Sequence, residues 1–371
     1  MHLDRPDADL APFGSYPPDD VVFVLKDLSH VELEAPLEDR EEAIQAGRHY
    51  SEMLPIEYRP TERYLELFHR TLSESAERVA LAAAVTAERL LAERGPDVVI
   101  ISLARAGTPV GVLLRRYLAA THGIAPPHYS ISIIRGRGID VNAVAEIRRR
   151  HPAAPLAVID GWTGKGAIQR ELTAACAPGA PAADLGLDDR MAVLADPGWC
   201  AVSWGTRDDF LIPSACLNAT VSGLVSRTVL NREVIGPGDF HGAKWYAELS
   251  DEDLSVHFVD SVAAWFPKVA EAAAAEAVRL DAEADPPTWA GAHDVAVIGE
   301  RFGLTDTNLI KPGVGETTRV LLRRLPWKIL VHPERTGEVE HVLVLAEERG
   351  VPVEEYREMT YSCCGLIKPL R

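Results

Sequence analysis

Residues 156–172 read LAVIDGWTGKGAIQREL, and this stretch decides the expected fold. An apolar run ends in Asp160, a turn with three glycines follows, and a segment with helical spacing comes next. A strand, a glycine turn and a helix start together form an anion site, because the first backbone N–H groups of a helix point outward and its dipole favours negative charge. Thr163 adds a hydroxyl donor and Lys165 adds a cation.

The neighbouring segments repeat this alternation of strand and helix. DVVIISLA (97–104), HYSISII (128–134) and MAVLAD (191–196) are short apolar runs, and stretches with helical spacing separate them. Continuous apolar runs are typical of parallel strands that are buried on both faces. The order predicts an α/β fold with an open, mostly parallel sheet and helices on both faces.

The chain divides into three parts by composition. Residues 1–60 alternate short apolar runs with acidic, Pro-rich turns, which predicts an N-terminal extension or lid. Residues 61–304 hold the strand and helix alternation and end after a long Ala-rich helical stretch. Residues 305–371 then predict a second, small α/β domain.

Composition limits the classes of function. The 371 residues carry a formal net charge of −17, which argues against broad, nonspecific nucleic-acid binding but leaves room for a small local RNA site. No apolar run reaches the roughly 20 residues that span a bilayer, and the acidic start does not resemble a signal peptide, so we expect a cytoplasmic protein without a membrane partner. The five cysteines are odd in number and lack zinc spacing.

The glycine turn fits neither common nucleotide motif, because both the Walker A spacing and G-x-G-x-x-G are absent. The pattern of an apolar strand, Asp160 and T-G-x-G resembles the PRPP-binding motif of type I phosphoribosyltransferases. This resemblance implies that Asp160 holds the ribose hydroxyls as a catalytic residue. It also implies a loop for the ribose phosphate made of Gly161, Thr163, Gly164, Lys165, Gly166 and Ala167. Gly161 stands where that family usually has a second acid.

Two upstream segments extend the resemblance in the same order. SLARAGTPVGVLL (102–114) is similar to the pyrophosphate loop, and SIIRGRGID (132–140) lies where the family has a flexible catalytic hood. The resemblance implies that Arg135 and Arg137 close over a polyphosphate and that Mg²⁺ enters through the substrate, without direct protein ligands. The implied pyrophosphate loop consists of Ala104, Arg105, Ala106 and Gly107.

The central stretch 204–231 mixes polar and apolar residues, and it fits either a substrate pocket or turn and cap chemistry. The candidate pocket residues are Arg207, Asp208, Asp209, Ser214, Asn218, Ser222 and Arg227. Cys216 lies in the same stretch and raises an alternative, a thiol nucleophile activated by His49, His128 or His241. A buried, inert cysteine is the other interpretation.

The segment KPGVGETTRVLLRR (311–324) resembles the RNA-binding fold shared by ribosomal L7Ae-type proteins and the Pelota C-terminal domain. That fold opens a helix with Gly-x-Asn-Glu-x-x-Lys, and here Gly and Arg replace the Asn and the final Lys. The resemblance implies binding of structured RNA by Lys311, Gly313, Gly315, Glu316 and Arg319.

With HYSEMLPIEY (49–58), IPSACLNATVSGLVSRT (212–228) and KPGVGETTR (311–319), the chain resembles the StiP-type family of bacterial tellurite-resistance stress genes, which carries a cysteine protease label. Our main expectation is transfer of a ribose-phosphate group from PRPP, or a related sugar phosphate, in the synthesis of a nucleoside-like metabolite. The alternatives are a cysteine protease that uses Cys216 and an RNA-binding protein with a degenerate catalytic core. A homodimer is a further expectation.

Overall fold

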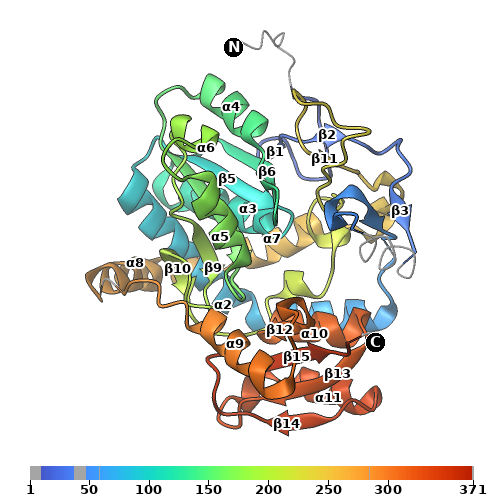
Figure 1. Cartoon of the computed structure of the whole chain (residues 1–371). Helices are drawn as coiled ribbons and strands as arrows, with labels where there is room; N and C mark the ends of the chain where they lie inside the picture. Colours follow the sequence, from blue (N-terminus) through green and yellow to red (C-terminus); the bar gives the residue numbers. More distant parts are fainter. Residues whose placement is uncertain (1–9, 37–46, 58, 284, 370–371) are drawn as a thin grey trace.

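The computed structural model describes residues 10–36, 47–57, 59–283 and 285–369. Two units are visible in Figure 1, a larger core around a twisted central sheet and a C-terminal unit below it. No helix among the described residues is long and apolar enough to cross a membrane.

The central sheet has the strand order β1-β6-β5-β8-β9-β10, and every pair along this path is parallel. Its strands, with the antiparallel β7 beside β6, are β1 (Val22–Phe23), β5 (Val99–Ala104), β6 (His128–Ile134), β7 (Gly138–Ile139), β8 (Leu156–Trp162), β9 (Ala192–Ala195) and β10 (Ser203–Thr206). The α/β fold with a mostly parallel sheet, expected from the apolar runs, is confirmed.

Helices cover both faces of this sheet because successive side chains of each strand point to opposite faces. Ile100 and Ile159 pack with α2, α3, α7 and α8 on one face, whereas Ile101 and Val158 pack with α4, α5 and α6 on the other. These helices are α2 (Glu62–Arg94), α3 (Gly107–His122), α4 (Val141–Arg150), α5 (Ala167–Ala175), α6 (Pro181–Asp184), α7 (Ser255–Ala263) and α8 (Phe266–Glu283).

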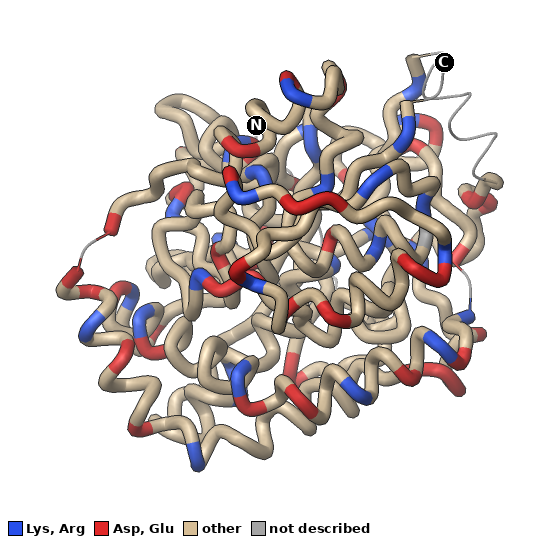
Figure 2. The backbone as a smooth tube through the Cα atoms, turned by 90° about the horizontal axis from the view of Figure 1, so that it is seen from below, with Lys and Arg blue, Asp and Glu red and all other residues tan. Residues whose placement is uncertain are grey.

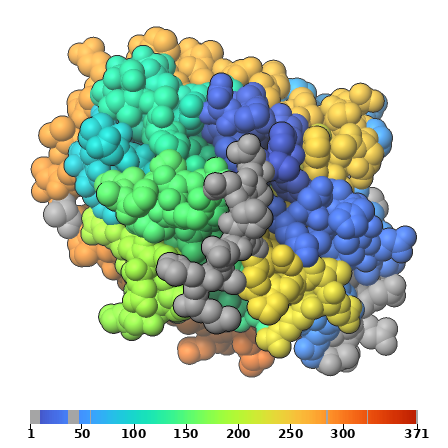
Figure 3. Space-filling model, turned by 90° about the horizontal axis from the view of Figure 1, so that it is seen from above, coloured from blue at the N-terminus to red at the C-terminus, as the bar shows by residue number. Residues whose placement is uncertain are grey.

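The N-terminal part, expected to be an extension or lid, contributes strand β1 to the edge of the central sheet. Figure 3 shows this part beside the segment around residues 225–245, where β2 pairs with β11. The short elements here and in the central stretch are β2 (Lys26–Asp27), β3 (Glu34–Ala35), η1 (Tyr50–Glu52), β4 (Leu54–Pro55), η2 (Pro213–Ala215), η3 (Ala219–Val221), β11 (Gly242–Ala243) and η4 (Ala247–Glu252). Residues 1–9, 37–46 and 58 of the expected lid lie outside the described residues.

The C-terminal unit has a four-stranded sheet in the order β12-β15-β13-β14. Its elements are α9 (Ala290–Phe302), η5 (Thr307–Leu309), β12 (Ile310–Pro312), α10 (Val314–Arg323), β13 (Pro326–Val331), η6 (Thr336–Glu338), α11 (Glu340–Glu348), β14 (Val353–Glu355) and β15 (Cys363–Ile367). Val295 and Ile298 of α9 pack on this sheet. The unit therefore begins near residue 290, ahead of the boundary expected at 305.

A buried aspartate holds the two units together. Asp209 follows β10, and its carboxylate accepts hydrogen bonds from the backbone N–H groups of Val314 (2.8 Å) and Ser362 (2.7 Å). Burial raises the pKa of Asp209 to about 6. The Tyr361 hydroxyl donates to the Gly164 carbonyl (3.2 Å) in the glycine turn of the core. These contacts seat β12 and α10 against the carboxyl ends of the central strands, as Figure 1 shows.

Candidate functional site

The three loops that resemble anion-binding loops lie together at the carboxyl end of the sheet. A Cβ atom on Gly107, at the start of α3, would lie 2.6 Å from the Ile159 carbonyl oxygen, and one on Gly161 would lie 3.1 Å from the Ala106 carbonyl oxygen. The approach at Gly107 requires glycine, whereas a Cβ atom at Gly161 would make a tight contact. Ligands in open α/β sheets bind at this edge.

A partly open cavity of about 310 Å³ lies over these loops. Its core wall includes Ala106, Arg135, Asp160, Trp162, Thr163, Gly164, Lys165, Gly166, Ala167, Gln169 and Cys200. Its other wall comes from β12 and α10 of the C-terminal unit, through Ile310, Lys311, Pro312, Glu316 and Arg319. We call this space the composite cavity, because neither unit encloses it alone.

Asp160 faces the composite cavity from the end of β8. Burial raises the pKa of its carboxyl to about 7, although the Gly161 N–H donates to its Oδ1 at 2.8 Å and favours the ionised form. A carboxyl group with this pKa exchanges its proton near neutral pH. It can therefore act as a general acid or a general base.

Positive charge exceeds negative charge in the cavity wall. Arg135, Lys165, Lys311 and Arg319 line it together with only two acids, Asp160 and Glu316. Burial, with the nearby charges of Lys311 and Arg135, lowers the pKa of Lys165 to about 8. Although burial opposes it, the cations Arg319 and Lys311 hold the pKa of Glu316 below its usual value. The site favours an anionic ligand.

The glycine turn packs directly on the loop that follows β9. The Thr163 hydroxyl donates to Asp196 Oδ1 (2.6 Å) and accepts from the Gly198 N–H (3.0 Å), and the Cys200 N–H donates to the same Asp196 oxygen (3.0 Å). Burial raises the pKa of Asp196 to about 6. The hydroxyl of Thr163 is therefore engaged within the protein.

Cys200 is the cysteine that lines the composite cavity. Its side chain hydrogen-bonds with Thr163 and Asp196, and burial together with the Asp196 charge raises the pKa of its thiol to about 12. Sequence reasoning missed this residue. A usable signal existed, because the strand 191–196 lies beside β8 and its following loop must reach the same edge of the sheet.

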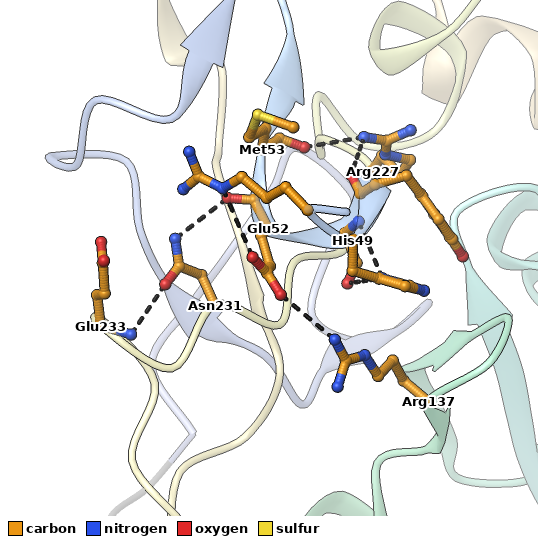
Figure 4. A network of polar contacts seen from close by, with 10 residues as sticks. His49, Glu52, Met53, Arg137, Arg227, Asn231 and Glu233 are labelled. Carbon is orange, nitrogen blue, oxygen red and sulfur yellow. Dashed lines mark hydrogen bonds and ion pairs between the residues drawn. The ribbon is translucent and has the colours of Figure 1, made fainter. Parts of the chain in front are cut away.

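The hood loop between β6 and β7 is held by the N-terminal segment around η1 (Figure 4). The Arg135 backbone N–H donates to the Tyr50 hydroxyl (3.0 Å). Arg137 Nη2 pairs with Glu52 Oε1 at 3.3 Å. Arg135 also donates from Nη1 to Asn308 Oδ1 (3.3 Å) in the C-terminal unit. Arg135 lines the composite cavity, whereas Arg137 pairs away from it.

Within the central stretch 204–231, Arg227 contacts the segment around η1 that holds the hood loop. Arg227 Nη2 donates to the carbonyls of Tyr50 and Met53, both at 2.8 Å (Figure 4). Arg207 lies between two indole rings, with its guanidinium carbon 3.8 Å from the Trp199 centroid and 3.7 Å from the Trp204 centroid. The side chains of these two arginines therefore stabilise the packing of the core.

The remaining candidates of this stretch also make internal contacts. Asp208 pairs with Arg78 at 2.9 Å, and the Ser222 hydroxyl donates to the Asn218 carbonyl at 2.7 Å. Ser214 is buried in η2. None of these four candidates lines the composite cavity as the structure describes it.

Cys216 is fully buried in the main apolar core beside Ala215 and Leu217. The histidines considered as its partners are engaged elsewhere. His128 lies between the Asp20 carbonyl (2.7 Å) and Ser102 Oγ (2.8 Å). His49 Nδ1 lies 2.8 Å from the Ser51 hydroxyl, and His241 Nδ1 lies 2.9 Å from the Ser132 hydroxyl.

The residues expected to bind RNA face the core. Lys311, Glu316 and Arg319 line the composite cavity. A Cβ atom on Gly313 would lie 3.1 Å from Asp209 Oδ1, and one on Gly315 would lie 3.3 Å from the Ala215 Cβ.

Residues 14–263, which hold the larger unit, match the family described as tellurite-like stress resistance cysteine protease StiP. The C-terminal unit matches the PELOTA RNA binding domain over residues 289–369. The cysteine protease StiP of Acinetobacter baylyi is 33% identical over 368 residues, which cover 96% of this chain and 94% of that protein. The chain belongs to the StiP family. No solved structure matches it.

These matches confirm the expected family and its Pelota-like C-terminal domain, but the predicted phosphoribosyltransferase activity is wrong. The family description and the Acinetobacter relative both name a cysteine protease, which was our alternative. The order of a strand, a glycine turn and a helix indicates the fold, but it does not determine which reaction the site catalyses. Gly161 already departed from the expected pair of acids. Mg²⁺, the homodimer and the cytoplasmic location stay predictions.

Proposed function

We propose that the chain is a thiol hydrolase that cleaves peptide bonds, with the composite cavity as its active site and Cys200 as its nucleophile. The family description and the name of the Acinetobacter relative support the class of reaction. The observation that carries the site is the position of Cys200 in the cavity wall, beside Asp196 and in the same cavity as Asp160. Cys216 lies in the apolar core instead.

In the proposed reaction one carboxyl group accepts a proton from the nucleophile and another donates a proton to the leaving group. Cys200 sulfur attacks the peptide carbonyl carbon while its thiol proton passes to Asp196. The C–N bond then breaks, and protonated Asp160 gives its proton to the leaving amine. Water then attacks the thioester and gives a proton to Asp160, the C–S bond breaks to release the carboxylic acid, and the sulfur takes its proton back from Asp196, which restores the resting state. Because burial keeps the resting sulfur protonated, the nucleophile forms only as the proton moves to Asp196.

The cavity wall favours substrates that carry a carboxylate or phosphate near the scissile bond. Lys165 and Lys311 provide positive charge, and the first N–H groups of α5 are placed to stabilise an oxyanion. For the C-terminal unit we propose RNA binding, which its match to the PELOTA RNA binding domain supports.

Turnover of dye-labelled casein by the full chain tests the hydrolase. We expect Cys200→Ser to lower the rate at least 100-fold, because a hydroxyl is a far weaker nucleophile than a thiol. Cys176→Ser is the matched control and should stay within twofold of wild type, since Cys176 does not line the described cavity.

Two other outcomes would each correct the proposal. If Cys216→Ser abolished turnover and Cys200→Ser did not, the nucleophile would be Cys216 and the assignment of Cys200 would be wrong. If a variant that lacks both Cys200 and Cys216 still hydrolysed casein at the wild-type rate, the chain would not be a thiol hydrolase.

A further inference from the structure

The composite cavity gathers cations that repel one another. Lys165 lies close enough to Lys311 and Arg135 for their charges to lower its pKa. Burial and the charge of Arg135 also lower the pKa of Lys311. A buried cluster of like charges is unfavourable until an anion neutralises it. Glu316 offsets part of this charge, since it pairs with Arg319 at 3.2 Å, and the positive charge that remains favours an anion that spans several cations.

Half of these cations come from the unit that matches an RNA-binding domain. Lys311 in β12 and Arg319 in α10 point into the cavity, where they meet Lys165 and Arg135 of the core. The remaining charges near the C-terminal unit are mixed in sign, and Figure 2 shows blue and red segments interspersed along the backbone on this side. Four cations line the cavity, whereas basic and acidic residues are interspersed along the backbone in this view.

The cavity also holds groups suited to a nucleobase. Trp162 lines it, and the guanidinium carbon of Arg319 lies 5.0 Å from the centre of the Trp162 ring. Indole and guanidinium planes are the surfaces on which single-stranded bases stack. Gln169 lines the same cavity with 4% exposure, and its Oε1 is buried without a hydrogen-bond partner among the described residues. A base amino group or a ribose hydroxyl would satisfy that oxygen.

We propose that the composite cavity binds the phosphorylated terminal nucleotide of a single-stranded RNA. The terminal phosphate lies among Lys165, Lys311 and Arg319, and the base lies against Trp162. The strand leaves through the mouth of the cavity between the two units. RNA and a peptide substrate then occupy the same space and exclude each other.

Fluorescence anisotropy with the full chain tests this inference directly. The probe is a six-nucleotide single-stranded RNA with a 5′-phosphate and a fluorophore on its 3′ end, and the same RNA with a 5′-hydroxyl is compared with it. The reverse pair carries a 3′-phosphate or a 3′-hydroxyl and a fluorophore on its 5′ end. We expect one phosphorylated end to bind at least tenfold more tightly than its hydroxyl counterpart.

Charge variants locate the bound end. Lys165→Ala and Arg319→Ala should each weaken binding of the phosphorylated RNA at least fivefold. Lys328→Ala is the matched control in the C-terminal unit, since Lys328 pairs with Glu354 on its outer sheet, and it should change binding less than twofold. Circular dichroism spectra and melting temperatures check that each variant is folded.

The outcomes that overturn the inference are equally definite. Equal affinity for phosphate and hydroxyl ends, or equal losses in Lys165→Ala and Lys328→Ala, would place RNA elsewhere. Tighter binding of a duplex than of the single strand would do the same. Complete displacement by 10 mM inorganic phosphate would identify a site for small anions only. None of these readouts uses hydrolysis, so a failed casein assay leaves the test intact.

Discussion

Replacement of Gly198 by alanine should separate the loop after β9, which carries Cys200 and is called the cysteine loop below, from the glycine turn. A Cβ atom at this position would lie 2.0 Å from the Gly164 carbonyl oxygen and 3.0 Å from Thr163 Oγ1. Relief of the first contact requires a backbone shift of more than 1 Å, since ordinary contacts begin near 3.4 Å. That shift also breaks the Gly198 N–H bond to Thr163, which is 3.0 Å long.

The expected destabilisation combines two effects. Overpacking in a closely packed region costs about 1–3 kcal/mol, and the lost hydrogen bond adds about 1 kcal/mol. We therefore expect Gly198→Ala to lower the free energy of unfolding by about 2–4 kcal/mol. Casein turnover should fall in parallel, because Cys200 moves with the loop.

Gly238→Ala is the matched control. A Cβ atom on Gly238 would meet no heavy atom within 4 Å outside its chain neighbours, and the φ of this residue lies outside the left-handed region. Its effect should stay within about 0.5 kcal/mol. Urea unfolding, followed by tryptophan fluorescence, measures both variants. A Gly198→Ala protein as stable as wild type, or equal losses in both variants, would refute the packing argument.

Three further predictions concern stability. Asp209→Ala leaves two buried N–H groups without their acceptor, so we expect a loss of about 2–5 kcal/mol and faster hydrogen exchange at those amides. Burial raises the pKa of Asp160 to about 7, above its value in the unfolded chain, so the native state binds the extra proton. Stability should therefore fall as pH rises from about 4 to 7. The melting temperature of Asp160→Asn should fall less than that of the wild type over that range. Arg207→Lys removes planar stacking between two indole rings and should lower stability by about 1–2 kcal/mol in urea unfolding.

The sequence predicted the central sheet well because its signal is local. Strands such as 97–104 and 128–134 are continuous apolar runs between helical segments, and burial on both faces demands such runs. Asp160 and the glycine turn were found for the same reason. Residues 20–28, DVVFVLKDL, also predict a short strand or buried segment, but β1 has two residues, too few for any period to show which strand it pairs with.

The composite cavity could not be predicted because it depends on how two units pack. Lys311 and Arg319 were expected to bind structured RNA, and the Asp209 contacts turn that end of the C-terminal unit toward the core. Cys200 lacked any motif and gained its place from the neighbouring strands. The chemistry was misjudged because anion-binding loops of this kind serve many reactions.

The order of the cavity walls along the chain has a consequence for synthesis. Cys200 leaves the ribosome 110 residues before Ile310, the first residue of β12, and the glycine turn leaves earlier still; β12 and α10 then close the cavity. At about 5–20 residues per second, several seconds separate the two events. A nascent chain therefore carries its sulfur and both carboxyl groups without the wall that holds a substrate. Under the proposed hydrolase function, the substrate site becomes complete only when residues 310–319 have folded into place.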